Sequence, residues 1–392
     1  RFNFGPDFRY YRNGTFRNEE SISSEGKNRA SLSNQSDFSW TLDNLIYYDK
    51  EIGKHSFGLT LLQSATGYHY EESSMAAEGI PLESAKWNAL SKENVSLLDE
   101  WNSGLIEKQL LSYMFRVNYD YNNKYLLTVS GRWDGASQLA EGNKWAFFPS
   151  AALGWRLDQE EFLKDVTWLN QLKFRLGVGV TGNSAIDPYQ TKGAIVSLYY
   201  PFGAPLAPGY AASEPLIKDG AVAMANKDLS WEKTTQYNIG LDYSVLNGRI
   251  SGVLDFYTSR TTDLLMAMTI PSLNGYTNTY ANVGKTSNIG VDITLNTVNI
   301  KTRDFEWSTS INAAWQKDKI DELANGKEDD INNNWFIGQA LGVIYGYECG
   351  GLWKEEDAAE MAKFNAKGHS FQAGMVRPVD QNGDYKIDPN DD

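Results

Sequence analysis

Cysteine and histidine are nearly absent from the 392-residue sequence, which contains one cysteine and three histidines. Cys349 has no second thiol for an internal disulfide and no companions for a metal–thiolate cluster, so we expect it only to pack. The histidines, at positions 55, 69 and 369, lack the ligand spacing of a metal site. The sequence also lacks a Gly-x-Ser-x-Gly elbow and any Cys/His nucleophile pattern. We therefore expect no catalytic centre, and the chain is not predicted to be an enzyme.

Basic residues and long apolar runs are also scarce. Lys and Arg total 36 against 50 Asp and Glu; the net charge of −14 argues against a nucleic-acid partner, whose phosphates require basic residues. No stretch approaches the ~18 consecutive apolar residues of a transmembrane helix. A β-barrel is not excluded, because its strands cross with about ten alternating residues each. The first residues, RFNFGPDFRYYRNG, have no signal-peptide pattern and are typical of a strand interior. We therefore expect the chain to be a piece of a longer polypeptide.

Aromatic residues are abundant, at 13% of the chain, and they follow a period of two. In YMFRVNYDY (113–121) the odd positions are apolar or aromatic and the even ones mostly polar, which predicts a strand with one apolar face. The pattern resumes after the turn signal Asn122-Asn123. It returns at residues 149–157, 172–180, 237–243, 289–295 and 307–315. We expect about twelve strands in all, the first from about Phe2 to Tyr11 and the last within Leu341–Trp353.

Two architectures fit strands whose second face is polar and charged. In a soluble sandwich that face meets water outside, whereas in an outer-membrane barrel it lines the lumen and the apolar face meets lipid. The connections favour the barrel, because short and long ones tend to alternate along the chain. Short connections are expected at 49–54, 122–124, 158–171, 246–248 and 298–304, and long ones at 66–110, 135–144, 182–234, 259–287 and 317–338. One pair breaks the series, since 158–171 is longer than 135–144.

Long blocks of the sequence strongly resemble the SusC/RagA family of TonB-dependent outer-membrane transporters. The first block is LLSYMFRVNYDYNNKYLLTVSGRWDGASQLAEGNKWAFFPSAALGWRLDQEEFLKD (110–165), and the second is WLNQLKFRLGVGVTGNSAIDPY (168–189). NKDLSWEKTTQYNIGLDYSVLNGRISGVLDFYTSRTTDLL (226–265) and NVGKTSNIGVDITLN (282–296) look like the family's later strands. The resemblance covers nearly the whole chain and rests on ordered blocks, so it is specific.

This resemblance implies an all-β fold, an antiparallel transmembrane β-barrel with short periplasmic turns and long extracellular loops. Residues 1–392 would form part of one barrel domain, supplying about 12 of an expected ~22 strands. The plug, the TonB box and the closing strands are expected to lie outside this chain. The source would be a Gram-negative bacterium of the Bacteroidota type, with the protein in the cell outer membrane.

The resemblance also implies function and partners. Family members import oligosaccharides or peptides beneath a SusD-like surface lipoprotein that acts as a lid, and the TonB–ExbB–ExbD system energises import. The expected function is therefore active import across the outer membrane, in contact with the lipid bilayer. The alternative is a soluble or surface-exposed β-rich module that binds glycans without transporting them.

Aromatic residues in the expected long loops are candidates for contact with substrate or lid. Aromatic faces stack on sugar rings and pack on peptide side chains. The alternative is that these residues pack the loops against each other or against the lid. The candidates are Trp87, Trp101, Tyr199, Tyr200, Phe202, Tyr210, Trp335 and Phe336.

The last residues, VDQNGDYKIDPNDD, have nearly the spacing of a calcium loop. Asp380, Asn382 and Asp384 occupy positions 1, 3 and 5, the carbonyl of Lys386 position 7, Asp388 position 9 and Asp391 position 12. Position 6 is Tyr385 instead of the usual glycine, and position 12 is Asp instead of Glu. The family often carries a D-x-N-G-D-G-x-I-D stretch here. Calcium is therefore a possible cofactor, and the alternative is an Asn/Asp-rich turn without metal.

Overall fold

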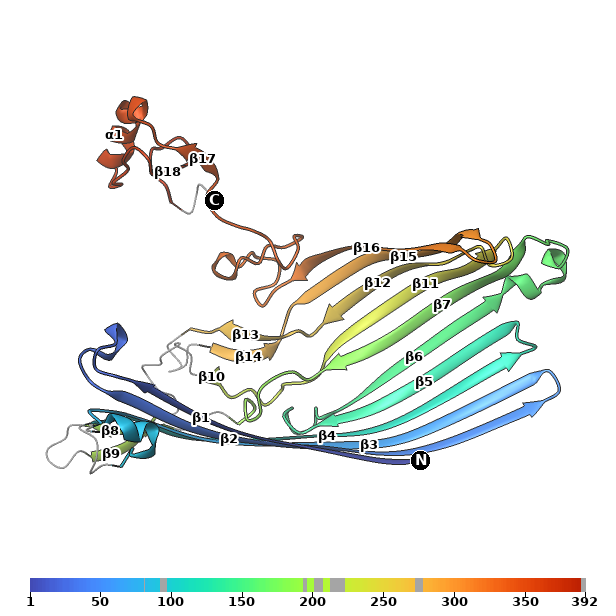
Figure 1. The fold of residues 1–392 in the computed structure, drawn as a ribbon, viewed down its shortest axis with the longest axis horizontal. Helices are drawn as coiled ribbons and strands as arrows, with labels where there is room; N and C mark the ends of the chain where they lie inside the picture. The colour runs from blue at the N-terminus through green and yellow to red at the C-terminus, as the bar shows by residue number, and fades with distance from the viewer. Residues whose placement is uncertain are drawn as a thin grey trace.

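The computed structural model describes residues 1–80, 82–91, 97–192, 196–200, 207–211, 223–271 and 278–388. Its main feature is one eleven-stranded antiparallel sheet, here named the wall, in which neighbours in space follow chain order (Figure 1). The strands are β1 (Phe2–Arg17), β2 (Arg29–Ile52), β3 (His55–Glu78), β4 (Leu97–Tyr121), β5 (Tyr125–Ala136), β6 (Trp145–Arg156), β7 (Leu169–Asn183), β11 (Glu232–Val245), β12 (Ile250–Thr262), β15 (Lys285–Lys301) and β16 (Glu306–Glu322).

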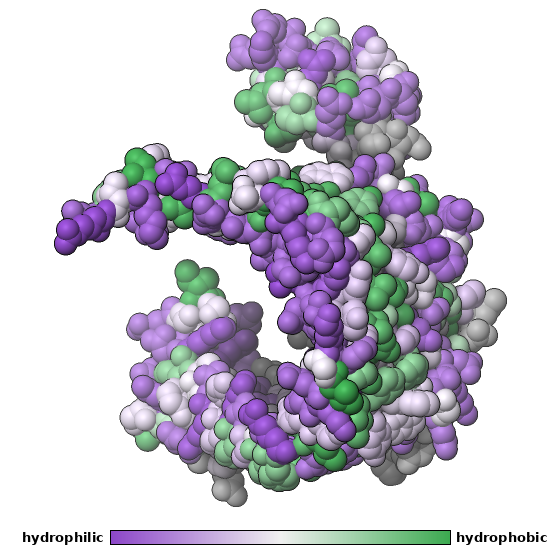
Figure 2. Space-filling model, turned by 90° about the vertical axis from the view of Figure 1, so that its right-hand side faces the viewer, coloured by the Kyte–Doolittle hydropathy of each residue, from purple (hydrophilic) through white to green (hydrophobic). Residues whose placement is uncertain are grey.

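The period of two seen in the sequence sorts side chains onto the two faces of the wall. In register, Phe115 of β4 lies opposite Gly131 of β5, and Val129 of β5 lies opposite Ala151 of β6. Large apolar side chains on this face remain exposed, among them Phe115, Val129 and Ile293. Viewed from one end, the wall curves around a hollow, and hydrophobic residues gather on its convex side (Figure 2). The predicted antiparallel barrel segment, with one apolar and one polar face, is confirmed.

Short and long connections lie at opposite ends of the wall, as predicted (Figure 1). Asn122 and Asn123 have φ of 55° and 53°, the left-handed conformation that Asn tolerates in tight hairpins. The connection 157–168 remains longer than 137–144, so the one exception also holds. Connections at 53–54, 122–124, 157–168, 246–249 and 302–305 form the short-turn end, and those at 18–28, 79–96, 137–144, 184–231 and 263–284 form the long-loop end.

The extent of the first strands was predicted wrongly. Residues 66–110 were expected to be a loop, but β3 continues to Glu78 and β4 begins at Leu97, with paired residues throughout. The first strand likewise runs past Tyr11 to Arg17. These extensions lie at the long-loop end, beyond the band in which one face of the wall is apolar. Their sequence, such as EESSMAAE (71–78), loses the alternation on which the prediction depended.

Smaller elements of secondary structure lie within the connections between the strands of the wall. A three-stranded sheet contains β10 (Ala223–Met224), β14 (Asn278–Asn282) and β13 (Leu265–Thr269), and β8 (Val196–Tyr200) pairs with β9 (Ala207–Ala211). No helix in the described ranges is long and apolar enough to cross a membrane. The 3-10 turns are η1 (Ile22–Ser24), η2 (Glu83–Asn88), η3 (Leu157–Gln159), η4 (Glu161–Leu163), η6 (Ile331–Asn333) and η7 (Glu355–Asp357).

The segment after β16 does not add a twelfth strand to the wall: a strand does form within Leu341–Trp353, as predicted, but it lies outside the barrel sheet. Only β17 (Cys349–Leu352) forms there, and it pairs with β18 (Val376–Pro378) in a separate sheet. Gly346, with φ of 156°, lies in the part of the run that forms no strand, and Gly351, with φ of 106°, lies within β17 where its register with β18 shifts. Residues 349–388, with α1 (Ala358–Ala366), form a terminal lobe at the long-loop end (Figure 1).

Two hydrophobic clusters lie away from the convex face. The larger packs the long-loop end around Phe148, Leu229 and Trp231, with the two aromatic rings edge to face at 5.3 Å. The smaller is the core of the terminal lobe and contains Trp353, Met361 and Phe364. The middle of the wall has no comparable core of its own within the described residues, because its apolar side chains point outward.

Candidate functional site

An ion triad spans three strands on the concave face of the wall. The Arg175 guanidinium on β7 lies 2.8 Å from an Asp242 carboxylate oxygen on β11 and 3.0 Å from an Asp255 oxygen on β12. Gly240 lies between them, and a Cβ there would be 2.6 Å from Arg175 Cζ. The absence of a side chain at Gly240 therefore makes room for the guanidinium, and the triad ties the three strands together.

A hollow of about 450 Å³ lies on the same face toward the short-turn end. Its floor is low because Gly58, Ala152 and Gly177 are among its lining residues. Charged side chains of both signs, including Asp49 and Lys173, also line it. The surface offers hydrogen bonds and charge to a polar solute or to water.

A larger cavity, of about 970 Å³, opens among the connections at the long-loop end. It is lined by β4, by the β5–β6 connection and by the connection after β7, and it is unusually rich in amino groups. Hydrogen bonds hold these segments together: the Gln138 amide donates to the Ser184 carbonyl at 3.0 Å, and the Glu107 N–H donates to the Tyr189 hydroxyl at 3.2 Å. The charged lining residues are Lys108, Lys144, Lys192, Lys227, Glu107 and Glu141.

Sequence reasoning missed this cavity. Its four lysines come from three separate segments, and loop residues carry no periodicity that would predict their meeting. The available signal was weaker: the sequence does place Lys144 and Lys192 in predicted long connections. The cavity can accept a carboxylate, a hydroxyl-rich ligand or a backbone carbonyl, since each is an acceptor for lysine.

The predicted loop aromatics do not gather into one site. Trp87 packs its ring over Gly14 of β1, where an added Cβ would lie 2.3 Å from the ring. Phe336 packs on Tyr345, with ring centroids 4.7 Å apart. Trp335 lies beside it and closes a short backbone bridge to Asp330. Phe336 therefore packs within its own connection, and Trp87 packs against strand β1.

Trp101 lies in a strand of the wall, β4, and its side chain is 77% exposed. Its partner in register is Met75 on β3, which is also exposed. Tyr199 and Tyr200 belong to β8 and Tyr210 to β9, but their side chains lie outside the described part of the chain. Phe202 lies wholly outside the described residues.

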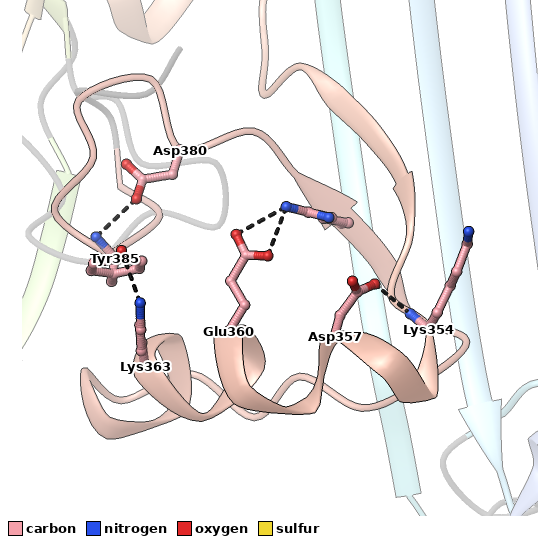
Figure 3. Close-up of polar contacts among 7 residues, drawn as sticks. Lys354, Asp357, Glu360, Lys363, Asp380 and Tyr385 are labelled. Carbon is pink, nitrogen blue, oxygen red and sulfur yellow. Dashed lines mark hydrogen bonds and ion pairs between the residues drawn. The ribbon is translucent and has the colours of Figure 1, made fainter.

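The predicted calcium loop is folded by its own hydrogen bonds (Figure 3). The Asp380 carboxylate accepts the N–H groups of Gly383 at 2.7 Å and Tyr385 at 2.9 Å. Asn382 accepts from the N–H of Asp384 at 2.9 Å, and Asp384 accepts from that of Lys386 at 2.8 Å. Side-chain oxygens at positions 1, 3 and 5 are thereby turned toward the inside of the loop.

Tyr385 adopts the left-handed conformation, with φ of 60°, that glycine normally supplies at position 6. Its ring lies edge to face on Phe364, and the Lys363 ammonium sits 3.2 Å from its hydroxyl (Figure 3). Packing in the lobe core thus holds a non-glycine residue in a conformation that it would otherwise avoid. The loop therefore keeps its turn although Tyr385 replaces the usual glycine at position 6.

The donor set of this loop is only partly carboxylate. Asp388 lies 2.7 Å from the Lys386 ammonium, and Asp391 is outside the described residues. Across the described ranges, no three His, Cys, Asp or Glu side chains gather as a metal-binding group. A cation here would therefore use the Asn382 amide and the Lys386 carbonyl, oxygen donors that suit calcium.

An ion pair and a buried ring brace the lobe beside this loop. Arg377 on β18 reaches both carboxylate oxygens of Glu360 on α1, each at 2.9 Å, and its guanidinium lies 4.7 Å from the centre of the Trp353 ring. Asp357 accepts the Lys354 N–H at 3.0 Å at the start of the helical segment (Figure 3). These contacts support a folded unit and form no catalytic arrangement.

Comparison with known proteins gives consistent matches. Residues 1–386 match the family described as TonB dependent receptor-like, beta-barrel. TonB-dependent receptor P26 of Formosa agariphila is 31% identical, over 100% of this chain and 40% of its own length. TonB-dependent receptor SusC of Bacteroides thetaiotaomicron is 34% identical, over 84% of this chain and 33% of its own length. The chain thus spans two-fifths or less of these relatives.

A solved structure agrees in fold. The RagAB peptide transporter superposes with a TM-score of 0.77 at 24% identity, covering 90% of this chain and 38% of that one. At this identity the likeness concerns the fold, and it extends along nearly the whole of the chain.

Proposed function

Because the chain belongs to the TonB-dependent receptor β-barrel family, and to its SusC/RagA type, we propose that it forms part of the wall of an active importer of oligosaccharides or peptides. Proteins of this family lie in the outer membrane of Gram-negative bacteria, and so does this one. Outer-membrane barrels place short turns in the periplasm and long loops outside, so we assign the short-turn end to the periplasm and the long-loop end to the outside. The observation that supports this proposal most strongly is the wall itself, which is apolar on its convex face and charged on its concave face.

The alternative of a soluble glycan-binding module conflicts with the convex face. Side chains as large as Trp315, Phe256 and Tyr237 stand there exposed, on several adjacent strands. A soluble protein rarely exposes a contiguous apolar surface of this extent. In lipid the same surface is stabilising, and the polar concave face then borders the solute path.

The proposal includes two partners, a SusD-like lipoprotein lid and the TonB–ExbB–ExbD system. The lid would cover the long-loop end, where the lysine-lined cavity opens. Trp101, with its exposed indole, is our candidate for contact with lid or substrate, together with Tyr199 to Phe202, Tyr210 and the remaining loop aromatics. Charge-neutral substitutions in residues 199–202 that left both complex formation and uptake unchanged would count against these contacts.

Uptake by living cells tests the proposed activity. Cells carrying the full-length gene would be given pools of fluorescently labelled oligosaccharides and labelled peptides. Import of one pool should require both the full-length gene and TonB, and removal of the neighbouring SusD-like gene should lower it. Uptake that persists without TonB, or no uptake of either pool, would contradict the proposal. The pool that enters identifies the cargo class.

We also propose that the loop from Asp380 to Asp388 binds calcium. Its support is the set of oxygens at positions 1, 3 and 5 and the left-handed residue at position 6. The ion would stiffen an extracellular loop and would take no part in chemistry.

Calorimetric titration of calcium into the full-length transporter tests this. Asp380→Ala and Asp384→Ala should each abolish the binding heat. Glu356→Ala, which removes an exposed carboxylate of the same lobe, should leave it unchanged. Equal heats for all four proteins would support the turn without metal.

A further inference from the structure

A groove of about 440 Å³ runs along the convex face near the periplasmic turns. Strand register builds it from two cross-strand rows. Tyr125, Trp155 and Phe174 are aligned across β5, β6 and β7, and Leu127, Leu153 and Leu176 form the next row. Leucine side chains reach less far from the sheet than those of Tyr, Trp and Phe. The leucines therefore form the floor of the groove, and the three aromatic rings form a bank beside it. Leu153, at the centre of the floor, is 54% exposed.

One carboxylate holds the aromatic bank in place. Glu160 accepts hydrogen bonds from the Trp155 indole at 2.9 Å and from the Tyr125 hydroxyl at 2.8 Å, and it pairs with the Lys124 ammonium at 2.6 Å. These donors lower the pKa of Glu160, with Lys124 as the largest cause. Two of the three rings of the aromatic bank, Tyr125 and Trp155, are therefore oriented by a charged group.

The next residue along the turn carries an exposed ion pair. Glu161 and Lys164 bond to each other, and their side chains are 82% and 54% exposed. They follow Glu160 directly in the chain, so they lie at the headgroup level of the same strand ends. One negative and one positive group side by side complement a headgroup that carries both charges. Lys124 offsets the charge of Glu160, so the Glu161–Lys164 pair sets the local charge, and its carboxylate disfavours a purely anionic headgroup.

We propose that this groove is a binding site for a zwitterionic phospholipid of the periplasmic leaflet, such as phosphatidylethanolamine. One acyl chain lies on the leucine floor against the aromatic bank. The ammonium approaches Glu161 and the phosphate approaches Lys164. The groove is continuous with the lipid-facing band of the wall, so the occupant comes from the membrane itself. The inference depends on the outer-membrane location and not on the cargo.

Native mass spectrometry of the purified full-length transporter tests the site, with phosphatidylethanolamine and phosphatidylglycerol added in separate titrations. Leu153→Trp fills the groove with an apolar side chain that suits lipid. We expect this variant to retain one phosphatidylethanolamine fewer than the wild type. Leu254→Trp, on the convex face of β12 away from the groove, is the matched control and should retain the wild-type number. Heat-modifiable migration on gels confirms that both variants are folded.

The headgroup assignment has its own test. Glu161→Lys leaves the groove intact but makes the ion pair wholly basic, so preference should shift at least several-fold toward phosphatidylglycerol. Equal lipid retention by Leu153→Trp and Leu254→Trp would overturn the groove as a site. Equal affinity of the wild-type protein for both lipids would overturn the headgroup contacts.

Discussion

The wall and the terminal lobe arrange the same kinds of side chain in opposite ways. In the wall, Val129 and Ile293 point outward from a curved sheet while Arg175 and Asp255 line its inside. In the lobe, Trp353 and Phe364 are buried and Glu360 and Arg377 lie at the surface. The difference follows from the surroundings, since the wall meets lipid on its apolar side, whereas the lobe encloses its apolar side chains in a core of its own. A single chain therefore exposes its apolar side chains on the convex face of the wall and buries them in the lobe that follows β16.

Removal of the lobe's central ring should have the largest effect. Trp353 is 1% exposed, so Trp353→Ala should cost the lobe about 3–5 kcal/mol. Leu352→Ala, at the exposed neighbour, is the control and should cost little. Hydrogen exchange in residues 358–366 measures the loss, while heat-modifiable migration reports on the wall and should not change. A fall in wall stability would show that lobe and wall are one cooperative unit.

A charge on the lipid face should come next. Val129 lies between Tyr125 and Trp133 on β5, near the middle of the apolar band. Val129→Arg should destabilise the barrel in vesicles by about 2–4 kcal/mol, because the guanidinium would enter hydrocarbon. Thr128→Arg places the same group on the polar concave face and should cost far less. Denaturant unfolding of both variants gives the comparison, and equal losses would contradict the assignment of faces.

A methyl group at Gly240 should have a smaller effect that is confined to the concave face. Its Cβ would lie 2.5 Å from an Asp255 oxygen and 2.6 Å from Arg175 Cζ. Gly240→Ala should therefore displace the triad and cost about 1–3 kcal/mol. Gly177→Ala is the matched control, because its nearest neighbour is at 3.9 Å. The outcome that counts against the triad is an equal unfolding midpoint for the two variants.

Acid should weaken the periplasmic end slightly. The pKa of Glu160 lies below its usual value because Lys124, Trp155 and Tyr125 stabilise the carboxylate. As pH falls below about 4.5, the unfolded chain takes up this proton before the folded chain does, so acid favours unfolding. Stability should thus decrease on acidification, and Glu160→Gln should reduce that decrease. Unfolding curves at pH 7 and pH 4 measure it, and an unchanged pH dependence in the variant would contradict the role of Glu160.

The sequence predicted the strands of the wall wherever one face meets lipid. Between 113 and 121 the odd-numbered residues, all apolar or aromatic, lie on the convex side, because alternation there has a physical cause. Prediction failed at 66–110, since strands that extend beyond the apolar band have water on both sides and need no alternation. It failed in part at Leu341–Trp353, where only Cys349–Leu352 forms a strand, and this short strand pairs outside the wall with a shift of register around Gly351.

The candidate sites were predicted less well, for a related reason. The spacing from Asp380 to Asp388 is local, so the turn was visible in the chain. The lysine-lined cavity and the Glu160 cluster each depend on segments far apart in sequence, such as Lys124 with Glu160 and Lys108 with Lys192. Tertiary packing brings these groups together, and a one-dimensional pattern does not contain that information.

The seam between β7 and β11 has a consequence for the order of folding. Every other neighbouring pair near it is joined by a short hairpin or a modest loop, but this pair is separated by residues 184–231. Closing a connection of that length costs about 2 kcal/mol more than closing a four-residue turn. We therefore expect the sheet to fold as two halves, β1–β7 and β11–β16, which pair with each other late in folding. Arg175 on β7 forms ion pairs with both Asp242 and Asp255 of the second half. These ion pairs would then form last and stabilise the pairing of the two halves.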